Sequence, residues 1–170
     1  MQDLRLLTAT VACWVPGIVP EALFWGEIDM SEPQRPPRRP LPKLTEADTA
    51  EFWKRTRDQQ LSYQQCGACD GIVFYPRRHC THCLGSNLEW RTASGRGTVY
   101  TFSVVRQSYH PFFRAQVPYA VAWIDLEEGP RILSNVVGLA DPGTQLEIGQ
   151  SVVVEWEAHE ELSIPLFKPV

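Results

Sequence analysis

The sequence predicts a mainly β protein in which an N-terminal helix and a zinc ribbon precede a five-stranded barrel. Two observations carry this prediction: a pair of Cys-x-x-Cys motifs near the middle of the chain, and strand-like patterning after residue 97. A chain of 170 residues with 44% hydrophobic and 21% charged side chains is long enough for one ordinary domain or two small modules. We expect four parts: an N-terminal extension with a Pro/Arg-rich arm at 1–44, the helix at 45–64, the ribbon at 65–94 and the barrel at 95–170.

The two cysteine motifs predict a structural zinc site with the ligands Cys66, Cys69, Cys80 and Cys83. Zinc takes four soft ligands in a tetrahedron, and a two-residue spacing lets one tight turn present two thiolates to the same ion. Iron would use the same four sulfur atoms, so the element stays open. Two local disulfides, or four unrelated thiols, are the alternative to a metal. The histidines His79 and His82 are expected to be exposed neighbours of the site.

The net charge of −4 argues against a dedicated nucleic-acid binder, which usually has a basic excess. Five cysteines leave Cys13 over once a metal has taken four, and an odd count with metal spacing indicates a reducing compartment, so we expect a cytoplasmic protein. The apolar run 6–19 is too short to span a bilayer and contains Pro16 and Gly17. A signal peptide is the alternative for this run, but Asp3 lies where a basic residue is expected.

The first 43 residues contain two different segments. Residues 1–29 have no clear period, and one hypothesis is that translation starts at Met30, which would make them an upstream extension. Residues 31–43 hold five prolines interleaved with four basic side chains, which predicts an extended arm. This arm is either a solvated linker or a basic segment that contacts phosphate or an acidic partner.

A helix is expected to begin at Thr45 and to end near Gln60, because Thr45 and Asp48 have the spacing of a capping box. Phe52 and Trp53 form an aromatic ridge on this helix, which we expect to pack on the following domain or on a partner. Short strand-like runs flank the cysteine motifs at 61–65, 72–75 and 88–92.

Five strands are predicted in the C-terminal half, at 98–106, 119–126, 131–137, 151–158 and 164–168. The turn at 127–130 makes the second and third a hairpin, while 140–150 is a long connection before the fourth. Five strands with a long link before the fourth favour a small Greek-key barrel of the OB type. A fragment of a β-sandwich is the alternative, because strand count alone does not fix closure.

Taken together and in this order, these motifs resemble the DUF35 family, whose acyl-CoA-associated members join a rubredoxin-like zinc ribbon to an OB-fold. The resemblance covers about residues 45–169 and leaves the first 44 unexplained. It implies an accessory subunit that binds and stabilises a thiolase-like or aldolase enzyme in lipid, steroid side-chain or ketone metabolism. It also carries the metal ligands over to the four cysteines. The matching motifs are Phe52-Trp53, Cys66-x-x-Cys69, Phe74-Tyr-Pro-Arg77, Cys80-x-x-Cys83, Glu89-Trp90, Ser94-Gly-Arg-Gly-Thr-Val-Tyr-Thr101, His110-Pro111 and Val117-Pro-Tyr-Ala120.

No catalytic constellation is found in the sequence, so an independent enzyme acting on acyl-CoA is disfavoured. Four thiolates saturate zinc, and His110 before Pro111 is expected to be a structural or interface residue rather than a general base. Interface cores favour aromatic residues, so the predicted partner surface is Phe52, Trp53, Tyr109, His110, Phe112 and Phe113. Cations that could contact a CoA thioester or another anion are Arg77, Arg78, Arg96, Arg106 and Arg114.

The alternative function is single-stranded nucleic-acid binding, which OB folds perform with stacked aromatics in a basic groove. Tyr100 and Phe102 are expected to share a strand face with Arg106, as such a groove requires. The acidic balance of the chain and four glutamates late in the barrel argue against this function; they are Glu155, Glu157, Glu160 and Glu161.

Overall fold

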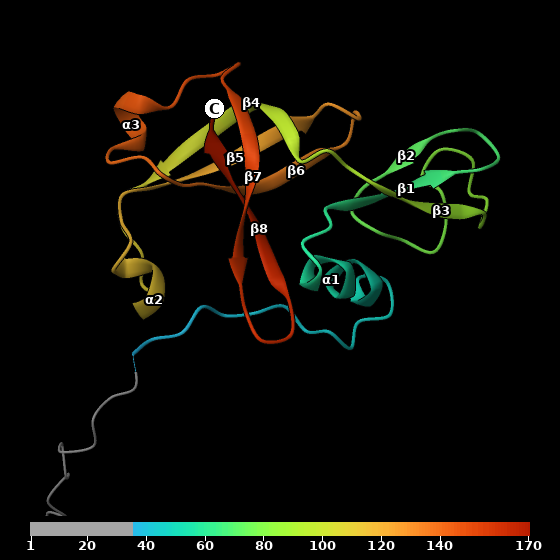
Figure 1. Cartoon of the computed structure of the whole chain (residues 1–170), viewed down its shortest axis with the longest axis horizontal. Helices are drawn as coiled ribbons and strands as arrows, with labels where there is room; N and C mark the ends of the chain where they lie inside the picture. Colours follow the sequence, from blue (N-terminus) through green and yellow to red (C-terminus); the bar gives the residue numbers. More distant parts are fainter. Residues whose placement is uncertain (1–35) are drawn as a thin grey trace, which may run out of the picture. The chain divides into compact units, whose positions relative to one another are not determined.

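The computed structural model describes residues 36–170, so the predictions about Cys13, Met30 and the start of the arm lie outside the described residues. The structure is mainly β, as predicted (Figure 1). No helix in the described part is long and apolar enough to cross a membrane. The elements are α1 Ala50–Arg57, β1 Ser62–Cys66, β2 Ile72–Val73, β3 Leu88–Thr92, β4 Arg96–Val105, α2 Pro111–Arg114, β5 Tyr119–Leu126, β6 Arg131–Val136, α3 Pro142–Gln145, β7 Ser151–Ala158 and β8 Ser163–Pro169.

The C-terminal strands close into a barrel with the order β4-β5-β6-β8-β7, which confirms the OB-type prediction over the sandwich. β5 and β6 form the predicted antiparallel hairpin, and β6 meets β8 in parallel through Val136 and Phe167. The long connection before β7 contains the short helix α3. Every second residue of β5 points into the barrel, where Ala122 and Ile124 are fully buried against Phe167.

The ribbon is a three-stranded antiparallel sheet with the order β2-β1-β3. Its own buried cluster consists of Cys66, Val73 and Cys80, with Leu88 packed against it. So little buried apolar surface cannot offset the chain entropy lost on folding, which is the usual reason for a bound metal in a ribbon.

The helix α1 begins at Ala50, five residues later than predicted. Thr49 is its N-cap and makes no side-chain capping bond. The predicted capping box is not formed, and the Asp48 carboxylate pairs instead with the Arg78 guanidinium, 3.0 Å from Oδ1 to Nε. This exposed ion pair joins the segment before α1 to the ribbon loop.

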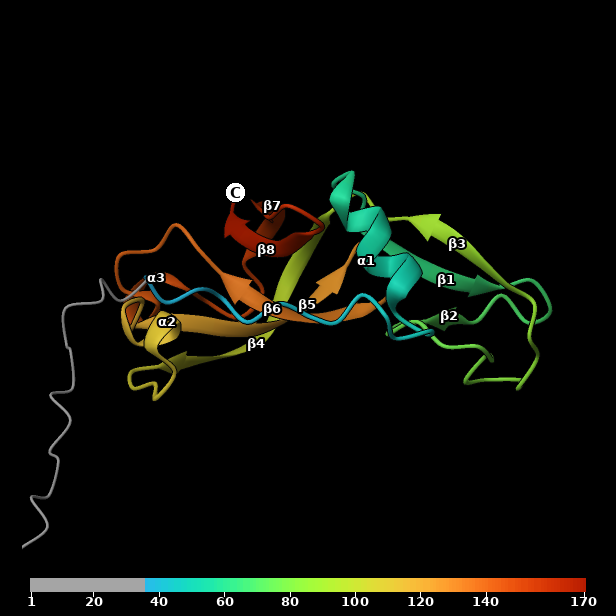
Figure 2. The same ribbon diagram turned by 90° about the horizontal axis from the view of Figure 1, so that it is seen from below.

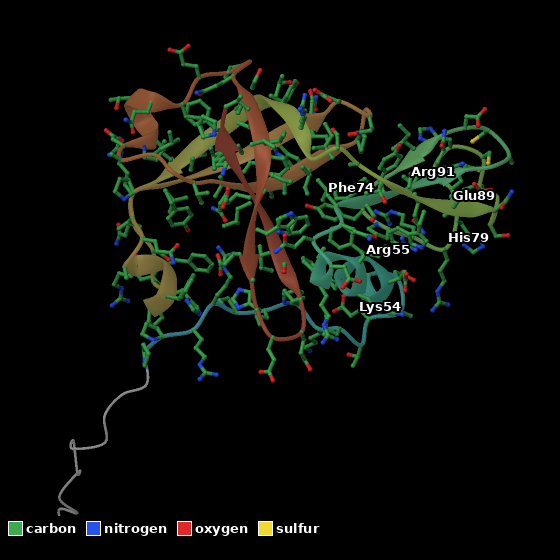
Figure 3. All side chains as sticks on the ribbon, in the orientation of Figure 1. Lys54, Arg55, Phe74, His79, Glu89 and Arg91 are labelled. Carbon is green, nitrogen blue, oxygen red and sulfur yellow. The ribbon has the colours of Figure 1, made fainter. Side chains whose placement is uncertain are left out.

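Side chains of α1 and of the ribbon base extend the barrel core. Phe52 on α1, 3% exposed, belongs to one buried cluster with Leu61 and the barrel residue Val99. The helix lies between β1 and β8 (Figure 2). Figure 3 shows Arg55 on α1 beside the ribbon, where its guanidinium lies 5.1 Å from the ring centroid of Trp90 on β3. The helix therefore joins the ribbon to the barrel through one continuous core.

Candidate metal centre and surface sites

The four cysteine sulfur atoms lie within 4.8 Å of one another at the outer end of the ribbon. Two of the pairs, Cys66 with Cys83 and Cys69 with Cys80, are each 3.6 Å apart, and both join the two motifs. Tetrahedral zinc with bonds of about 2.3 Å places its sulfurs about 3.8 Å apart. The sulfur cluster therefore fits one tetrahedral metal ion. Two disulfides within the motifs, or four separate thiols, would not bring all four sulfurs into one cluster.

The two cysteine motifs fold into equivalent turns. The Cys66 amide donates to the Gly71 carbonyl at 2.9 Å, and the Cys80 amide donates to the Gly85 carbonyl at 2.8 Å. Gly71 is needed because a Cβ there would lie 2.5 Å from Cδ2 of His82. The His82 ring is exposed, and its Nε2 lies 3.2 Å from the Ile72 carbonyl. His82 is therefore a neighbour of the four sulfurs and not a member of the candidate ligand set.

Backbone amides prepare one sulfur for metal binding. The N–H groups of Cys83 and His82 lower the pKa of Cys80 to about 6, and the His82 nitrogen lies 3.4 Å from its sulfur. The Gly71 amide lowers the pKa of Cys69, but hydrogen bonds with the neighbouring thiols, together with burial, raise it to about 12. Protons are thus held between crowded sulfurs, and a bound cation would displace them.

Three of the five predicted anion-contacting arginines, Arg77, Arg78 and Arg96, have separate surroundings. Arg78 is paired with Asp48, and Arg77 is exposed on the same loop, where its amide donates to the Gln64 side chain. Arg96 lines a hollow of about 530 Å³ at the end of β4, together with Asp125 and Glu127. Each of these hydrogen bonds and hollows is local, so no shared anion site forms from these three residues.

The other two predicted arginines, Arg106 and Arg114, line one hollow of about 340 Å³ with Tyr109 and Val117. The Tyr109 ring is 84% exposed. This hollow is the place where predicted cations and a predicted interface aromatic come together.

The predicted interface residues fall into buried, half-buried and exposed groups. Phe52 is buried in the core and is therefore not accessible to a partner, which corrects its prediction as an interface residue. Trp53 is half-buried against the same cluster. His110 is the N-cap of α2 and accepts a hydrogen bond from the Phe112 amide through Nδ1 at 3.2 Å. This capping role agrees with the expectation that His110 is structural.

Phe112 and Phe113 are covered on one side by the arm. Arg39 lies 5.5 Å from the Phe112 ring centroid and 5.3 Å from that of Phe113, and its Nε is 3.0 Å from a carboxylate oxygen of Glu157. The Arg39 side chain is only 10% exposed. The solvated-linker interpretation is therefore wrong at this residue, because its acidic partner is part of the same chain. No local pattern in the sequence indicates the Arg39–Glu157 pair, because its two residues are more than a hundred positions apart.

The predicted alignment of Tyr100 with Phe102 is wrong. The pairing of β4 with β5 shifts between Val99 and Thr101, which is the signature of a bulge. An extra residue moves all later side chains to the opposite face of the strand. Tyr100 is consequently 51% exposed, whereas Phe102 packs against the barrel core.

Sequence reasoning missed an exposed apolar surface on the outside of the barrel. We call it the sheet-face patch: Tyr75, Tyr100, Trp123 and Leu133, each between 38% and 51% exposed. Trp123 on β5 is paired directly with Leu133 on β6. Burial raises the pKa of Tyr75, although a backbone hydrogen bond from Leu133 lowers it. The alternation of residues 119–126 was the available signal, since it placed Trp123 opposite to the inward Ala122 and Ile124.

Charged residues at the edge of the sheet-face patch are paired with each other. The Arg131 guanidinium lies 3.4 Å from the Tyr100 ring centroid and donates to Asp125, with Nη2 and Oδ2 3.0 Å apart. The Asp125 hydrogen bond raises the pKa of Arg131. The sheet-face patch is thus apolar and aromatic, and the charge of the neighbouring Arg131 is neutralised by Asp125.

A closed OB barrel that carries a four-cysteine ribbon defines the class of zinc-ribbon OB-fold proteins. Family models match both parts: "ChsH2, rubredoxin-like zinc ribbon domain" over residues 53–89 and "ChsH2, C-terminal OB-fold domain" over residues 90–157. A "DUF35 domain-containing scaffold protein" of Methanothermobacter thermautotrophicus is 32% identical, with 62% of this chain and 78% of that protein covered. The chain belongs to the DUF35 family.

Two further relatives carry names from acyl-CoA metabolism or aldolase chemistry. A "probable enoyl-CoA hydratase alpha subunit" of Thermomonospora curvata is 37% identical over 77% of this chain, which spans only 40% of that relative. A solved chain of an "Ltp2-ChsH2(DUF35) aldolase" is 38% identical with a TM-score of 0.64, covering 77% of this chain and 98% of the solved one. The described fold therefore corresponds to nearly the whole of that chain.

Proposed function

We propose that this chain is a non-catalytic accessory subunit that binds and stabilises a thiolase-like or aldolase enzyme in acyl-CoA metabolism. The scaffold name of one relative and the aldolase name of a solved neighbour support this role. The zinc-ribbon family model supports zinc as the structural ion. Four cysteines that are grouped as metal ligands and not joined as disulfides, within residues 36–170, support a reducing, cytoplasmic location.

The absence of catalysis is supported by the chemistry of the metal centre. Four sulfur ligands fill a tetrahedral ion, so no position is open for a water molecule or a substrate. Catalytic acids and bases usually have strongly shifted pKa values. Within residues 36–170, the two groups with large shifts are Cys69 and Cys80, and both are metal-site thiols.

The sheet-face patch is the observation that carries the proposal. Trp and Tyr side chains that stand exposed on a rigid sheet are typical of interface hot spots. Trp123 and Leu133 are held by paired strands of the closed barrel, so little side-chain or backbone ordering is left for association to cost. An enzyme subunit docked on β5 and β6 would bury Trp123 and Leu133 together with Tyr75 of the ribbon.

The proposal is tested by isolating the tagged full chain from its native host and identifying stoichiometric partners by mass spectrometry. A thiolase-like or aldolase subunit is expected, and it should remain bound at about 0.5 M salt because an apolar contact is weakly screened. Trp123→Ala should weaken the complex by about 30-fold or more, as loss of a hot spot does. Ile148→Ala is the matched control, since Ile148 is 69% exposed outside the patch. Equal affinity of the two variants for the partner would show that the sheet-face patch is not the interface.

Single-stranded nucleic-acid binding is the second candidate, and one observation favours it. Tyr100, Trp123 and Arg131 lie on the outer face that includes the second and third barrel strands, where OB folds bind oligonucleotides. Asp125 neutralises Arg131, however, which removes the cation that such binding requires. RNA or DNA in the isolated material, released steeply as salt is raised, would establish this function in place of the accessory role.

A further inference from the structure

The hollow formed by the loop between β4 and β5 has the composition of an anion site. We call it the loop hollow; it has a volume of about 340 Å³ and is lined by Arg106, Gln107, Ser108, Tyr109, Arg114 and Val117. Small-molecule sites usually measure roughly 300–1,000 Å³. The loop hollow is thus large enough for a small ligand, and two of its six lining residues are arginines.

The charge balance of the loop hollow differs from that of four other hollows in the described part of the chain. Each of those four has at least one carboxylate among its cations, for example Asp125 and Glu127 beside Arg96. The loop hollow has no carboxylate in its lining. The nearest one in an ion pair is Asp141, whose Oδ1 is 4.0 Å from Nη2 of Arg106 and also accepts the Gly143 amide at 2.9 Å. One positive charge remains in excess even when Asp141 is included.

Arg114 is held in place by groups that do not cancel its charge. Its Nε donates to the Ser108 carbonyl at 3.3 Å, and its Nη2 donates to the Tyr109 carbonyl at 2.9 Å. A guanidinium has five N–H donors, so three remain for a ligand. Because carbonyl groups are neutral, the full positive charge also remains. Such a fixed and incompletely used guanidinium suits the several acceptor oxygens of a phosphate group.

The loop that carries these residues is fixed from its other side. Arg39 covers Phe112 and Phe113, and the Phe113 ring centroid lies 5.8 Å from that of Tyr119 on β5. The arm and the barrel therefore anchor α2, whose last residue is Arg114. A loop ordered before binding loses less conformational entropy when the ligand arrives.

Tyr109 adds a feature that inorganic anions do not need. Its ring is 84% exposed beside the two guanidinium groups, although exposure of a large apolar ring is unfavourable. An aromatic face next to paired cations suits a planar base attached to phosphate. We infer that the loop hollow binds a nucleoside phosphate, with Arg106 and Arg114 contacting the phosphates and Tyr109 stacking on the base.

This site is complete within one chain, so it does not depend on the accessory role. The experiment uses the full zinc-loaded chain alone, without any enzyme partner, and failure of either proposal therefore leaves the other standing. Isothermal titration calorimetry with ADP, adenosine, pyrophosphate and CoA separates the contribution of the phosphates to affinity from that of the base. ADP is expected to bind at least tenfold more tightly than adenosine or pyrophosphate, because each of those lacks one half of the recognition. CoA should match ADP, since the nucleotide end is what the hollow recognises.

Variants assign the binding to this hollow. Arg106→Gln and Tyr109→Ala should each weaken ADP about tenfold. Asp141→Asn should strengthen ADP binding about two- to threefold, because it removes the nearby negative charge and keeps an oxygen for the Gly143 amide. Arg96→Gln is the matched control for a surface arginine whose hollow contains carboxylates, and it should leave ADP affinity unchanged.

Three results would overturn the inference. They are no heat with ADP at millimolar concentration, equal affinity for pyrophosphate and ADP, or equal losses in Arg96→Gln and Arg106→Gln. Tighter binding of an oligonucleotide than of ADP, with the same salt-sensitive loss in the variants, would also overturn it in favour of a polynucleotide surface. Circular dichroism of each variant establishes that the chain is folded before its affinity is compared.

Discussion

The ribbon and the barrel differ in the interactions that stabilise them. The ribbon buries Cys66, Val73 and Cys80 in its own cluster, so two of its three core residues are candidate metal ligands. The barrel buries a continuous set of aliphatic and aromatic side chains around Phe167 and Ile124, which are fully buried. We therefore expect the stability of the ribbon to depend on a bound ion and that of the barrel to depend on apolar burial.

The part that joins them shows how the two kinds of stability are coupled. Phe52 and Leu61 precede the ribbon, and Ala93 follows it, yet all three belong to the barrel's buried cluster. Ser94 is further tied to the β5–β6 turn, where its amide donates to the Glu128 carboxylate at 2.6 Å. The entry and the exit of the ribbon are thus held by the barrel, while its outer end needs the metal.

Removal of the metal should have the largest effect. Chelation, or Cys80→Ser, is expected to unfold the outer ribbon, because metal binding supplies on the order of 10 kcal/mol to such modules. Hydrogen exchange followed by mass spectrometry should show loss of protection in β1, β2 and β3. Protection in β5 and β6 should persist, since the barrel core contains no ligand. Retained protection throughout the ribbon of the variant would contradict this difference, and the partner complex is expected to loosen as the ribbon unfolds.

Acidification should release the same ion reversibly. The pKa of Cys80 is lowered from 9.0 to about 6 in the folded chain, so its thiolate contributes stability that is fully present above 9.0 and is lost as the pH falls through about 6. Metal binding requires all four thiolates, and protons therefore compete with the ion. Zinc release, followed with a colorimetric chelator, is expected between about pH 6 and pH 4. Stoichiometric zinc at about pH 4 would contradict this pH range.

A cavity in the barrel core should act on the whole described domain. Phe167→Ala is expected to lower the free energy of unfolding by about 3–5 kcal/mol, the usual cost of a large-to-small change at a fully buried ring. Ile148→Ala, at a residue 69% exposed, should change it by less than about 0.5 kcal/mol. Urea denaturation of the zinc-loaded chains measures both. Similar values for the two variants would mean that the barrel core does not dominate stability.

The smallest changes in stability are expected from two arginine–carboxylate ion pairs that differ in burial. Arg39→Ala is expected to cost about 2 kcal/mol, because this side chain is 10% exposed, pairs with Glu157 and covers two rings. Arg78→Ala should cost about 0–0.5 kcal/mol, since the Arg78–Asp48 pair is 70% and 53% exposed. Thermal unfolding of the two variants compares them directly. An equal shift in both would argue that burial of Arg39 contributes nothing.

Much of the fold was predictable because its signals are local in the sequence. Motif spacing placed the four sulfurs, and residue periodicity placed β5 and β7 at their observed bounds. The helix start was predicted less well: α1 begins at Ala50, and Asp48, which was expected in a capping box, pairs with the distant Arg78. Short-range patterns thus located the elements, whereas some of their ends differ by a few residues from the prediction.

The candidate surfaces were predicted less well because they depend on residues that are far apart in the chain. Five arginines were equivalent in the sequence, and folding brought only Arg106 and Arg114 into one hollow. Trp123 and Leu133 became neighbours through strand pairing, and the bulge at Tyr100 reversed the face of the strand beyond it.

Residue spacing and periodicity predicted four candidate metal ligands and the five barrel strands, since both patterns follow from covalent geometry, and the resemblance of the motifs indicated the family. The contacts between distant segments came from the fold alone: Arg39 packs on its own barrel, Phe52 is part of the core and the sheet-face patch is exposed. The physical reason is that burial and charge pairing depend on which distant segments meet. That depends on the closure of the barrel as a whole, which no short stretch of residues encodes.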